Sequence, residues 1–136
     1  MDFMKSMAVA ASGLRTQAGR MRVIAENIAN ADSTAKSPGT DPYRRKIATF
    51  RSEVDRALDA NVIGLGRVRT DPAEFRTKYE PGHPATDPNG YVKYPNVNSL
   101  VEMTDMREAQ RSYEANINVI GATRRMLQRT IDLLRA

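Results

Sequence analysis

The sequence predicts a mainly α fold in which long N- and C-terminal helices pair as an antiparallel coiled coil and carry a small, irregular β-containing insertion. Near both ends of the chain, apolar residues recur at alternating intervals of three and four, the heptad period of helices packed along their length. The middle third is instead rich in proline and glycine and holds short alternating segments. We therefore expect an N-terminal coiled-coil helix at 1–31, an extended loop and β-containing insertion at 32–96, and a C-terminal coiled-coil helix at 97–136.

The N-terminal helix is expected to run from Asp2 to about Asn30, with the Asp2 side chain capping its positive end. Its apolar seam is unbroken and consists of Met7, Ala11, Leu14, Ala18, Met21, Ala25 and Ile28. Methionine adapts to irregular neighbours, and the small alanines let a partner helix approach closely. An ordinary amphipathic core helix would show the same period, but the matching seams at both ends of the chain favour helix–helix assembly.

The first part of the insertion is predicted to be a loop followed by a strand. Residues 30–42 are rich in Asn, Asp, Ser, Pro and Gly, and Ser37-Pro38-Gly39 is typical of a tight turn. Residues 43–50 alternate with period two, which indicates a strand. Residues 54–58 fit a short helix or a continuing strand equally well.

The second part of the insertion is predicted to be extended and interrupted by turns. A dinucleotide-binding motif at Gly64-Leu65-Gly66 would need a third glycine where Arg69 stands, so residues 61–69 are interpreted as a short strand pair with glycine kinks. Residues 71–95 are punctuated by proline. Within them, the run from Asp87 to Gly90 is a strong turn signal, and residues 91–94 form the next expected strand.

The C-terminal helix is expected to run from Ser99 to Ala136, with Ser99 and Glu102 forming a capping box at its start. After Met103, its seam consists of Met106, Gln110, Tyr113, Ile117, Ile120, Arg124, Leu127, Ile131 and Leu134. A helix of about 36 residues would be about 54 Å long, more than a chain of this size needs for its own core. Because polar seam residues fix alignment, we expect Arg124 to meet an acid or a helix carbonyl end of a neighbouring subunit.

The charge of the chain leaves one alternative class open. The formal net charge is +5, and Arg44, Arg45 and Lys46 form a basic cluster in a segment that would reach phosphates if it were exposed. A soluble basic helical module that binds nucleic acid or another partner is therefore the alternative interpretation. Basic and acidic residues are interleaved elsewhere, which favours a mixed, solvated surface over a nucleic-acid partner.

No pattern of catalytic or ligand-binding residues is found in the sequence. Cysteine is absent, and the one histidine, His83, lies between Gly82 and Pro84 as a turn residue. Glu102 and Asp105 are interpreted as solvated surface of a long helix rather than as an acid–base pair. We therefore expect no enzyme activity, no catalytic residues, no metal site, no cofactor and no small-molecule substrate.

The chain is also expected not to span a membrane, because no apolar run approaches ~18 residues. The N-terminus does not fit a cleaved signal peptide. Asp2 stands where such peptides carry positive charge, and Arg15 ends the apolar patch early.

Several short strings together resemble the flagellar basal-body rod protein family, and within it a member of the proximal rod. The strings run from end to end of the chain and are Glu26-Asn27-Ile28-Ala29-Asn30-Ala31, Pro42-Tyr43-Arg44-Arg45-Lys46, Tyr79-Glu80-Pro81-Gly82-His83-Pro84, Gly90-Tyr91-Val92, Pro95-Asn96-Val97-Asn98, Glu102-Met103, Asp105-Met106 and Arg111-Ser112-Tyr113-Glu114-Ala115-Asn116.

The resemblance implies a structural protein that stacks helically into the hollow rod, the drive shaft that crosses the periplasm and transmits torque from rotor to hook. It implies that the terminal helices line the shaft and that motility requires the protein. Implied partners are further copies of the chain, other rod proteins, the adapter at the rotor base and the flagellar type III export gate, with export that needs no cleaved signal peptide. Because the two seams are long and soft, we also expect the free subunit to become ordered on assembly.

Overall fold

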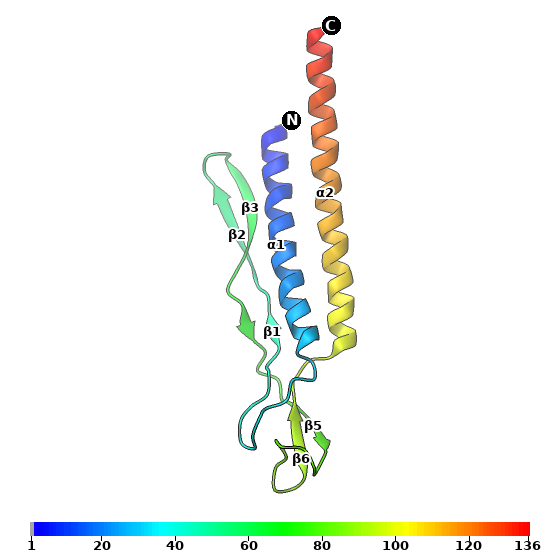
Figure 1. Cartoon of the computed structure of the whole chain (residues 1–136). Helices are drawn as coiled ribbons and strands as arrows, with labels where there is room; N and C mark the ends of the chain where they lie inside the picture. Colours follow the sequence, from blue (N-terminus) through cyan, green and yellow to red (C-terminus); the bar gives the residue numbers. More distant parts are fainter. Residues whose placement is uncertain (1) are drawn as a thin grey trace. The chain divides into compact units, whose positions relative to one another are not determined.

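The computed structural model describes residues 2–136, with a helix at each end and six short strands between (Figure 1). The elements are α1 (Phe3–Ala29), β1 (Lys46–Ile47), β2 (Phe50–Asp55), β3 (Ala60–Leu65), β4 (Arg69–Thr70), β5 (Arg76–Tyr79), β6 (Tyr91–Tyr94) and α2 (Ser99–Arg135). Helix accounts for 47% of the residues and strand for 18%. The two terminal helices are confirmed, whereas the description "mainly α" holds only in part.

The chain divides into two compact units, each assembled from distant segments. We call the first the helix-pair unit; it consists of Met1–Met21, Thr49–Arg67 and Arg107–Ala136. The second, the strand-loop unit, consists of Arg22–Ala48 and Val68–Met106. The predicted division at 1–31, 32–96 and 97–136 follows the order of the sequence instead and stays a prediction, with its residue 1 outside the described residues.

In the helix-pair unit, α1 and α2 lie side by side and antiparallel (Figure 1). Their contact is close and uses small residues: a Cβ built on Gly13 would lie 2.7 Å from Asn116 Nδ2. About two turns further along, Arg20 Nη2 lies 3.7 Å from Glu108 Oε2. Glycine at position 13 therefore permits an approach that any larger residue would hinder.

The β2–β3 hairpin belongs to the same unit and is fastened to α1 by hydroxyl groups. Phe50 pairs with Leu65 at one end of the antiparallel ladder and Asp55 with Ala60 at the other. The Ile63 N–H donates to Ser12 Oγ at 3.3 Å, and Thr16 Oγ1 donates to the Ile63 carbonyl at 3.1 Å. These bonds satisfy part of the β3 backbone edge that would otherwise be unpaired.

The structure of the hairpin settles the conformation of residues 54–58, which the sequence left open, and corrects the strand pairing expected within 61–69. Residues 54–58 continue β2 into a turn, in which Asp55 Oδ1 accepts the N–H groups of Ala57 at 3.0 Å and Leu58 at 3.3 Å. The expected strand pair within 61–69 was wrong, because β3 pairs with β2 and β4 with β1. Short-range glycine patterns indicate bends but carry no information on the pairing partner.

The strand-loop unit contains the pairs β1–β4 and β5–β6 and two of the largest fully buried apolar side chains. Val92 and Val97 are 0% and 1% exposed. The predicted strand at 91–94 is confirmed as β6, whereas the strand expected at 43–50 is reduced to β1 and the first residue of β2. The turn before β6 is also confirmed, since the Gly90 N–H donates to the Asp87 carbonyl at 3.0 Å and Gly90 has a φ of +88°.

Both helices begin with a side-chain cap, but only one is the expected cap. Asp2 Oδ1 accepts the N–H groups of Met4 and Lys5 at 3.1 and 3.2 Å, as predicted. At α2, the capping oxygen is Asn98 Oδ1, which accepts the N–H of Leu100 at 3.1 Å. The predicted capping box was wrong, because the Glu102 carboxylate bonds to the guanidinium of Arg45 instead of turning back to the helix start.

Candidate assembly interface

The apolar seam predicted on α1 lies beside the face that the chain itself buries. Five of its residues are half-buried, Ala18 and Ala25 are exposed, and none is fully buried; the half-buried ones are Met7, Ala11, Leu14, Met21 and Ile28. The residues that α1 does bury are Ala10, Ser12, Thr16, Val23, Ile24 and Asn27. Half of these are polar, so the intramolecular contact leaves much of the apolar seam accessible.

On α2, the buried row partly replaces the predicted seam. It has its own alternating spacing and consists of Glu102, Met106, Ala109, Tyr113, Asn116, Ile120 and Thr123, each buried or half-buried. Met106, Tyr113 and Ile120 belong to both rows. The other predicted positions in this stretch, Gln110, Ile117 and Arg124, are exposed. Where the predicted seam residues are exposed, the buried row instead contains a small or polar neighbour, namely Ala109, Asn116 or Thr123.

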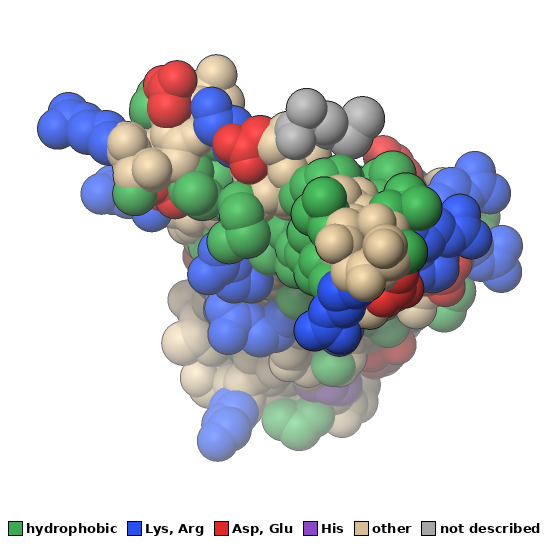
Figure 2. Space-filling view, turned by 90° about the horizontal axis from the view of Figure 1, so that it is seen from above, with side chains coloured by type: hydrophobic (Ala, Val, Ile, Leu, Met, Phe, Trp, Pro, Cys, Tyr) green, Lys and Arg blue, Asp and Glu red, His purple; other side chains and the backbone are tan. Residues whose placement is uncertain are grey.

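Beyond Thr123, every residue of α2 is exposed. We call Arg124–Ala136 the overhang. Its large apolar side chains have high exposed fractions, which are 41% for Met126, 37% for Leu127, 38% for Ile131, 78% for Leu133 and 82% for Leu134. Figure 2 looks onto this end of the helix pair and shows hydrophobic side chains gathered around the end of α2, with Lys and Arg beside them. Grouped apolar surface of this kind is typical of interaction sites.

The strand-loop unit holds a contrasting feature, a buried polar network centred on Asn27. Asn27 is 1% exposed. Its Oδ1 accepts the Tyr43 hydroxyl at 2.8 Å and the Lys46 N–H at 2.9 Å. Its Nδ2 donates to the Lys46 carbonyl at 2.8 Å and to Glu102 Oε2 at 3.4 Å. The side chain thus uses its full hydrogen-bonding capacity to join α1, β1 and α2 within this unit.

Glu102 supplies the negative charge of this polar network. Its side chain is 1% exposed and bonds Arg45 Nε, while Arg45 Nη1 also reaches Asp71 Oδ2 at 3.2 Å. Burial lowers the Arg45 pKa, but its bonds to Glu102 and Asp71 outweigh burial and raise that pKa above its ordinary value. The interpretation of Glu102 as solvated surface was therefore wrong, because a carboxylate is stable in the interior once a guanidinium pairs with it.

Two further ionisable groups of the network have shifted pKa values. Burial, followed by the nearby carboxylates of Glu26 and Glu102, raises the pKa of Tyr43 to about 12. The Ala73 N–H donates to Asp71 Oδ1 at 2.9 Å and is the main reason that the Asp71 pKa is lowered, with Arg45 adding to the effect. The tyrosine is thereby held neutral and the aspartate charged.

The three cations of the predicted basic cluster each bind groups within the chain. Arg44 Nη1 donates to the carbonyls of Asp71 and Ala73 at 2.8 and 2.9 Å, and its guanidinium lies 4.2 Å from the centre of the Phe75 ring. The Lys46 ammonium bonds the Glu26 carboxylate. With Arg45 in the network as well, the three cations do not form a patch for phosphates. A basic cluster was predicted because these three residues are consecutive in the sequence. The groups that pair with them lie far away along the chain, so the sequence pattern did not reveal them.

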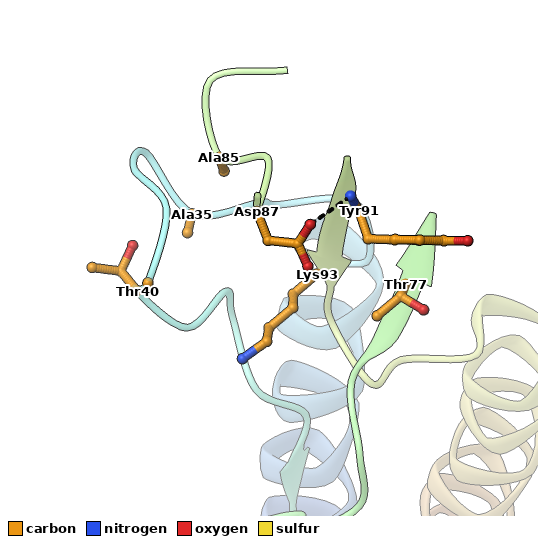
Figure 3. Close-up of a pocket in the computed structure, with 8 residues that line it drawn as sticks. Ala35, Thr40, Thr77, Ala85, Asp87, Tyr91 and Lys93 are labelled. Atoms are coloured by element: carbon orange, nitrogen blue, oxygen red, sulfur yellow. Dashed lines mark hydrogen bonds between the residues drawn. The ribbon is translucent and has the colours of Figure 1, made fainter. Parts of the chain in front are cut away.

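The remaining candidate features have local structural roles. His83 lies in a turn as predicted; its Nδ1 accepts the Ala85 N–H at 3.0 Å. The pocket in Figure 3, beside Asp87 and Tyr91, has a volume of about 80 Å³, below the ~300 Å³ of typical ligand sites. Within residues 2–136, no three His, Cys, Asp or Glu side chains are grouped to hold a metal ion. Neither described helix has a stretch long and apolar enough to cross a membrane.

Sequence patterns did not reveal the polar network as a site, although the strings that carried the resemblance contain its members. Asn27 belongs to the first string, Tyr43 and Arg45 to the second, and Glu102 to a later one. These residues meet in one cluster. The strings that resemble the flagellar rod family, which contain no catalytic pattern, were thus the one available indication of a structural cluster.

Comparison with known proteins agrees with the resemblance at both ends of the chain. Residues 7–35 match the family described as flagella basal body rod protein, and residues 89–133 match the family described as flagellar basal body rod FlgEFG protein C-terminal. The chain is 52% identical to the flagellar basal-body rod protein FlgC of Agrobacterium fabrum over 94% of its own length and 92% of that protein.

Similarity extends to relatives of lower identity. The chain is 38% identical to FlgC of Salmonella typhimurium, with 92% of each chain covered. It is 35% identical to FlgC of Bacillus subtilis, with 94% of this chain and 95% of that protein covered. The chain therefore belongs to the FlgC family of flagellar basal-body rod proteins.

Proposed function

We propose that this chain polymerises helically with other flagellar subunits into the hollow drive shaft that transmits torque from rotor to hook. As a member of its family, it is a structural component of the flagellar basal-body rod. The single observation that carries the proposed mode of assembly is the overhang, where five large apolar side chains are exposed on one helix end. Burying such a row on a neighbouring subunit would contribute about 25 cal/mol for each Å² removed from water.

The two predicted seams are proposed as the assembly interface. On α1, the accessible apolar seam adjoins the face that packs within the chain, so one helix offers an inner and an outer surface. On α2, Ile117, Leu127, Ile131 and Leu134 are exposed. Surfaces on different sides of a subunit make heterologous contacts, and heterologous contacts that do not close generate a helical polymer.

The polar network complements this role, because a shaft needs subunits that do not deform under load. Asn27, Arg45 and Glu102 cross-link elements of the strand-loop unit through buried, charge-assisted bonds. We infer a structural rather than a catalytic role for the chain. The terminal segments 1–31 and 97–136 are proposed to form the shaft lining, with 32–96 outside it.

The proposed partners are further copies of this chain, other rod proteins, the adapter at the rotor base and the flagellar type III export gate through which subunits would arrive. Family membership supports the rod partners, and the adapter and the gate follow from the position of the rod between the rotor and the hook. The alternative of a nucleic-acid-binding module has no support among the three relatives named above, which are rod proteins by name.

The experiment that tests the proposal is a clean deletion of the gene, followed by electron microscopy of isolated basal bodies. We expect non-motile cells whose basal bodies stop at the membrane ring, without rod or hook, and recovery when the wild-type gene is supplied in trans. Intact hooks and filaments in the deletion strain would overturn the proposal. Strong salt-dependent binding of the purified chain to nucleic acid would favour the alternative module.

A further inference from the structure

The overhang carries a second pattern besides its apolar row, a strong positive charge. It contains four arginines and one aspartate, for a net charge of +3; these residues are Arg124, Arg125, Arg129, Arg135 and Asp132. At about 100° per residue, the apolar side chains occupy one arc of about 160°, and the charged ones occupy the rest. Arg124 and Arg129 lie close to opposite borders of the apolar arc. A partner on this arc would therefore meet a guanidinium on either side.

The apolar arc also continues the row by which α2 contacts α1 in the helix-pair unit. From Thr123, steps of four, three and four residues lead to Leu127, Thr130 and Leu134. Gly13 faces Asn116 across the antiparallel pair. Ten residues back along α1 is Phe3, and ten residues forward along α2 is Met126, so α2 extends about 14 Å past the start of α1 at ~1.5 Å per residue. A helix in line with α1 would complete the pair there.

A second copy of this chain is a poor electrostatic match for that position. On its α1, Lys5, Arg20 and Glu26 are paired within the chain, with Asp59, Glu108 and Lys46. The exposed charges that remain on this helix are two cations, Arg15 and Arg22. The acids near the start of α2 are already paired within the chain, since Glu102 and Asp105 face Arg45 and Glu108 faces Arg20. Stacking copies end to end would thus place like charges together, which raises the free energy of association.

We propose that the overhang docks an amphipathic helix of a different polypeptide, one with acidic residues flanking its apolar stripe, placed in line with α1. The partner's apolar stripe covers Leu127 and Leu134, in the row that continues the contact with α1. Its carboxylates pair with Arg124 and Arg135 at one border of the apolar arc and with Arg129 at the other. Charge then selects the neighbour, because a helix with basic flanks loses these pairs and gains repulsion. The inference rests on the proposed function in that it names the chemistry of one partner of the rod subunit.

The test uses the full chain and two synthetic helical peptides that share one leucine heptad row but carry either glutamate or lysine at the flanking positions. At low salt, fluorescence anisotropy should show that the glutamate peptide binds about tenfold more tightly than the lysine peptide. The reason is that only the glutamate peptide can form the three exposed ion pairs with the arginines of the overhang. High salt should remove the difference. The triple variant Arg124→Glu, Arg129→Glu and Arg135→Glu should reverse the preference.

A matched control variant keeps the test specific to the overhang. Arg107→Glu with Arg111→Glu reverses two exposed charges on α2 outside the overhang and should leave the preference unchanged. Circular dichroism of each variant checks that the helix content equals that of the wild-type chain.

Equal binding of the two peptides, or binding of neither, overturns the inference. So does self-association of the wild-type chain in sedimentation equilibrium that the triple variant abolishes, because the occupant is then a second copy. Preferential binding to phosphatidylglycerol vesicles would identify a lipid surface as the occupant and overturn it as well. None of these results affects the deletion phenotype, so the proposed rod function can stand while this inference fails.

Discussion

The two ends of α2 depart from the usual burial pattern in opposite ways: one buries a charged residue and the other exposes apolar ones. Near its start, the Glu102 carboxylate is 1% exposed, whereas near its end the Leu134 side chain is 82% exposed. The carboxylate is stable inside because Arg45 and Asn27 replace the water it has lost. The leucine side chain lies in water, because no part of the described structure packs over it. We infer from this contrast that the start of α2 holds one subunit together, and we propose that its end meets another.

The sharpest test of this comparison is a substitution that removes assembly without removing the fold. Ile131→Asp places a charge on the apolar arc of the overhang, where Ile131 is 38% exposed in the single chain. We expect the free energy of unfolding to change by no more than about 0.5 kcal/mol, as for other surface substitutions. Motility should be lost, because a partner would have to bury the new carboxylate at a cost of several kcal/mol.

Urea denaturation and a swimming assay in soft agar measure the two effects separately. Asn118→Asp is the matched control, since it introduces the same carboxylate at an exposed position of α2 before the overhang. Normal swimming of the Ile131→Asp strain would show that this arc stays in water in the rod.

The second prediction concerns the opposite end of α2 and should affect the fold itself. Glu102→Ala leaves the Arg45 guanidinium without its main counter-charge and Asn27 Nδ2 without one acceptor. We expect a loss of about 3–5 kcal/mol in the free energy of unfolding, the usual effect of removing one partner from a buried pair. Asp105→Ala serves as the control, because Asp105 is 3.9 Å from Arg45 and its side chain is 31% exposed. Similar losses in both variants would contradict the special role of Glu102.

The third prediction follows from the Tyr43 hydroxyl, whose pKa is raised to about 12 from an ordinary value of 10.0. The folded chain keeps this proton between pH 10 and 12, whereas the unfolded chain releases it, so stability falls as the pH rises through that window. The loss approaches about 1.4 kcal/mol per pH unit and about 2.7 kcal/mol in total. Below pH 10, the full contribution is present.

Tyr43→Phe isolates this effect. At neutral pH, the variant should be less stable by about 1 kcal/mol, because the bond from the hydroxyl to Asn27 Oδ1 is lost. Between pH 10 and 12, the wild type should lose its advantage and become the less stable chain. Urea denaturation from pH 7 to 11.5 measures both, with Tyr79→Phe as the control because Tyr79 is 65% exposed. Parallel curves for wild type and Tyr43→Phe would refute the assignment.

The same contrast explains which parts of the fold the sequence predicted. Both helices, the Asp2 cap, the turn at 87–90 and the strand at 91–94 depend on neighbours a few residues apart, and all were confirmed. The pairing of β3 with β2 and of β4 with β1 depends on distant segments, so periodicity did not reveal it. Glu102 was misassigned for the same reason, since its partner Arg45 lies 57 residues away.

For the candidate interface, the heptad pattern marked apolar residues but not the direction in which they point. Met106, Tyr113 and Ile120 face into the chain in part, while Ile117 and Arg124 of the same seam are exposed. A period fixes which residues share a stripe, and two adjacent stripes on one helix can serve different partners. The small polar residues Ser12, Thr16 and Thr123 are buried within the chain, and an apolar pattern does not contain them.

The smallest expected effect compares two glycines that the sequence could not distinguish. Ala is about 1 kcal/mol more favourable than Gly inside a helix. Gly121→Ala should realise this gain, because its Cβ would meet only the flexible Arg125 side chain, at 3.4 Å. Gly13→Ala should not, because its Cβ would lie 2.7 Å from Asn116 Nδ2, which itself donates to the Ser112 carbonyl at 3.0 Å.

Thermal unfolding of the two single variants should therefore differ by about 1 kcal/mol or more, with Gly121→Ala the more stable. Adding Asn116→Ala to Gly13→Ala removes the obstructing amide, so the double variant should recover stability relative to the sum of the two single changes. Strict additivity of these two substitutions would mean that α1 and α2 are not in contact at this position. A favourable coupling free energy between the two substitutions would show that the helices approach closely at Gly13. The helix contact within the subunit would then be small and polar, distinct from the apolar surface that is proposed to bind a neighbouring subunit.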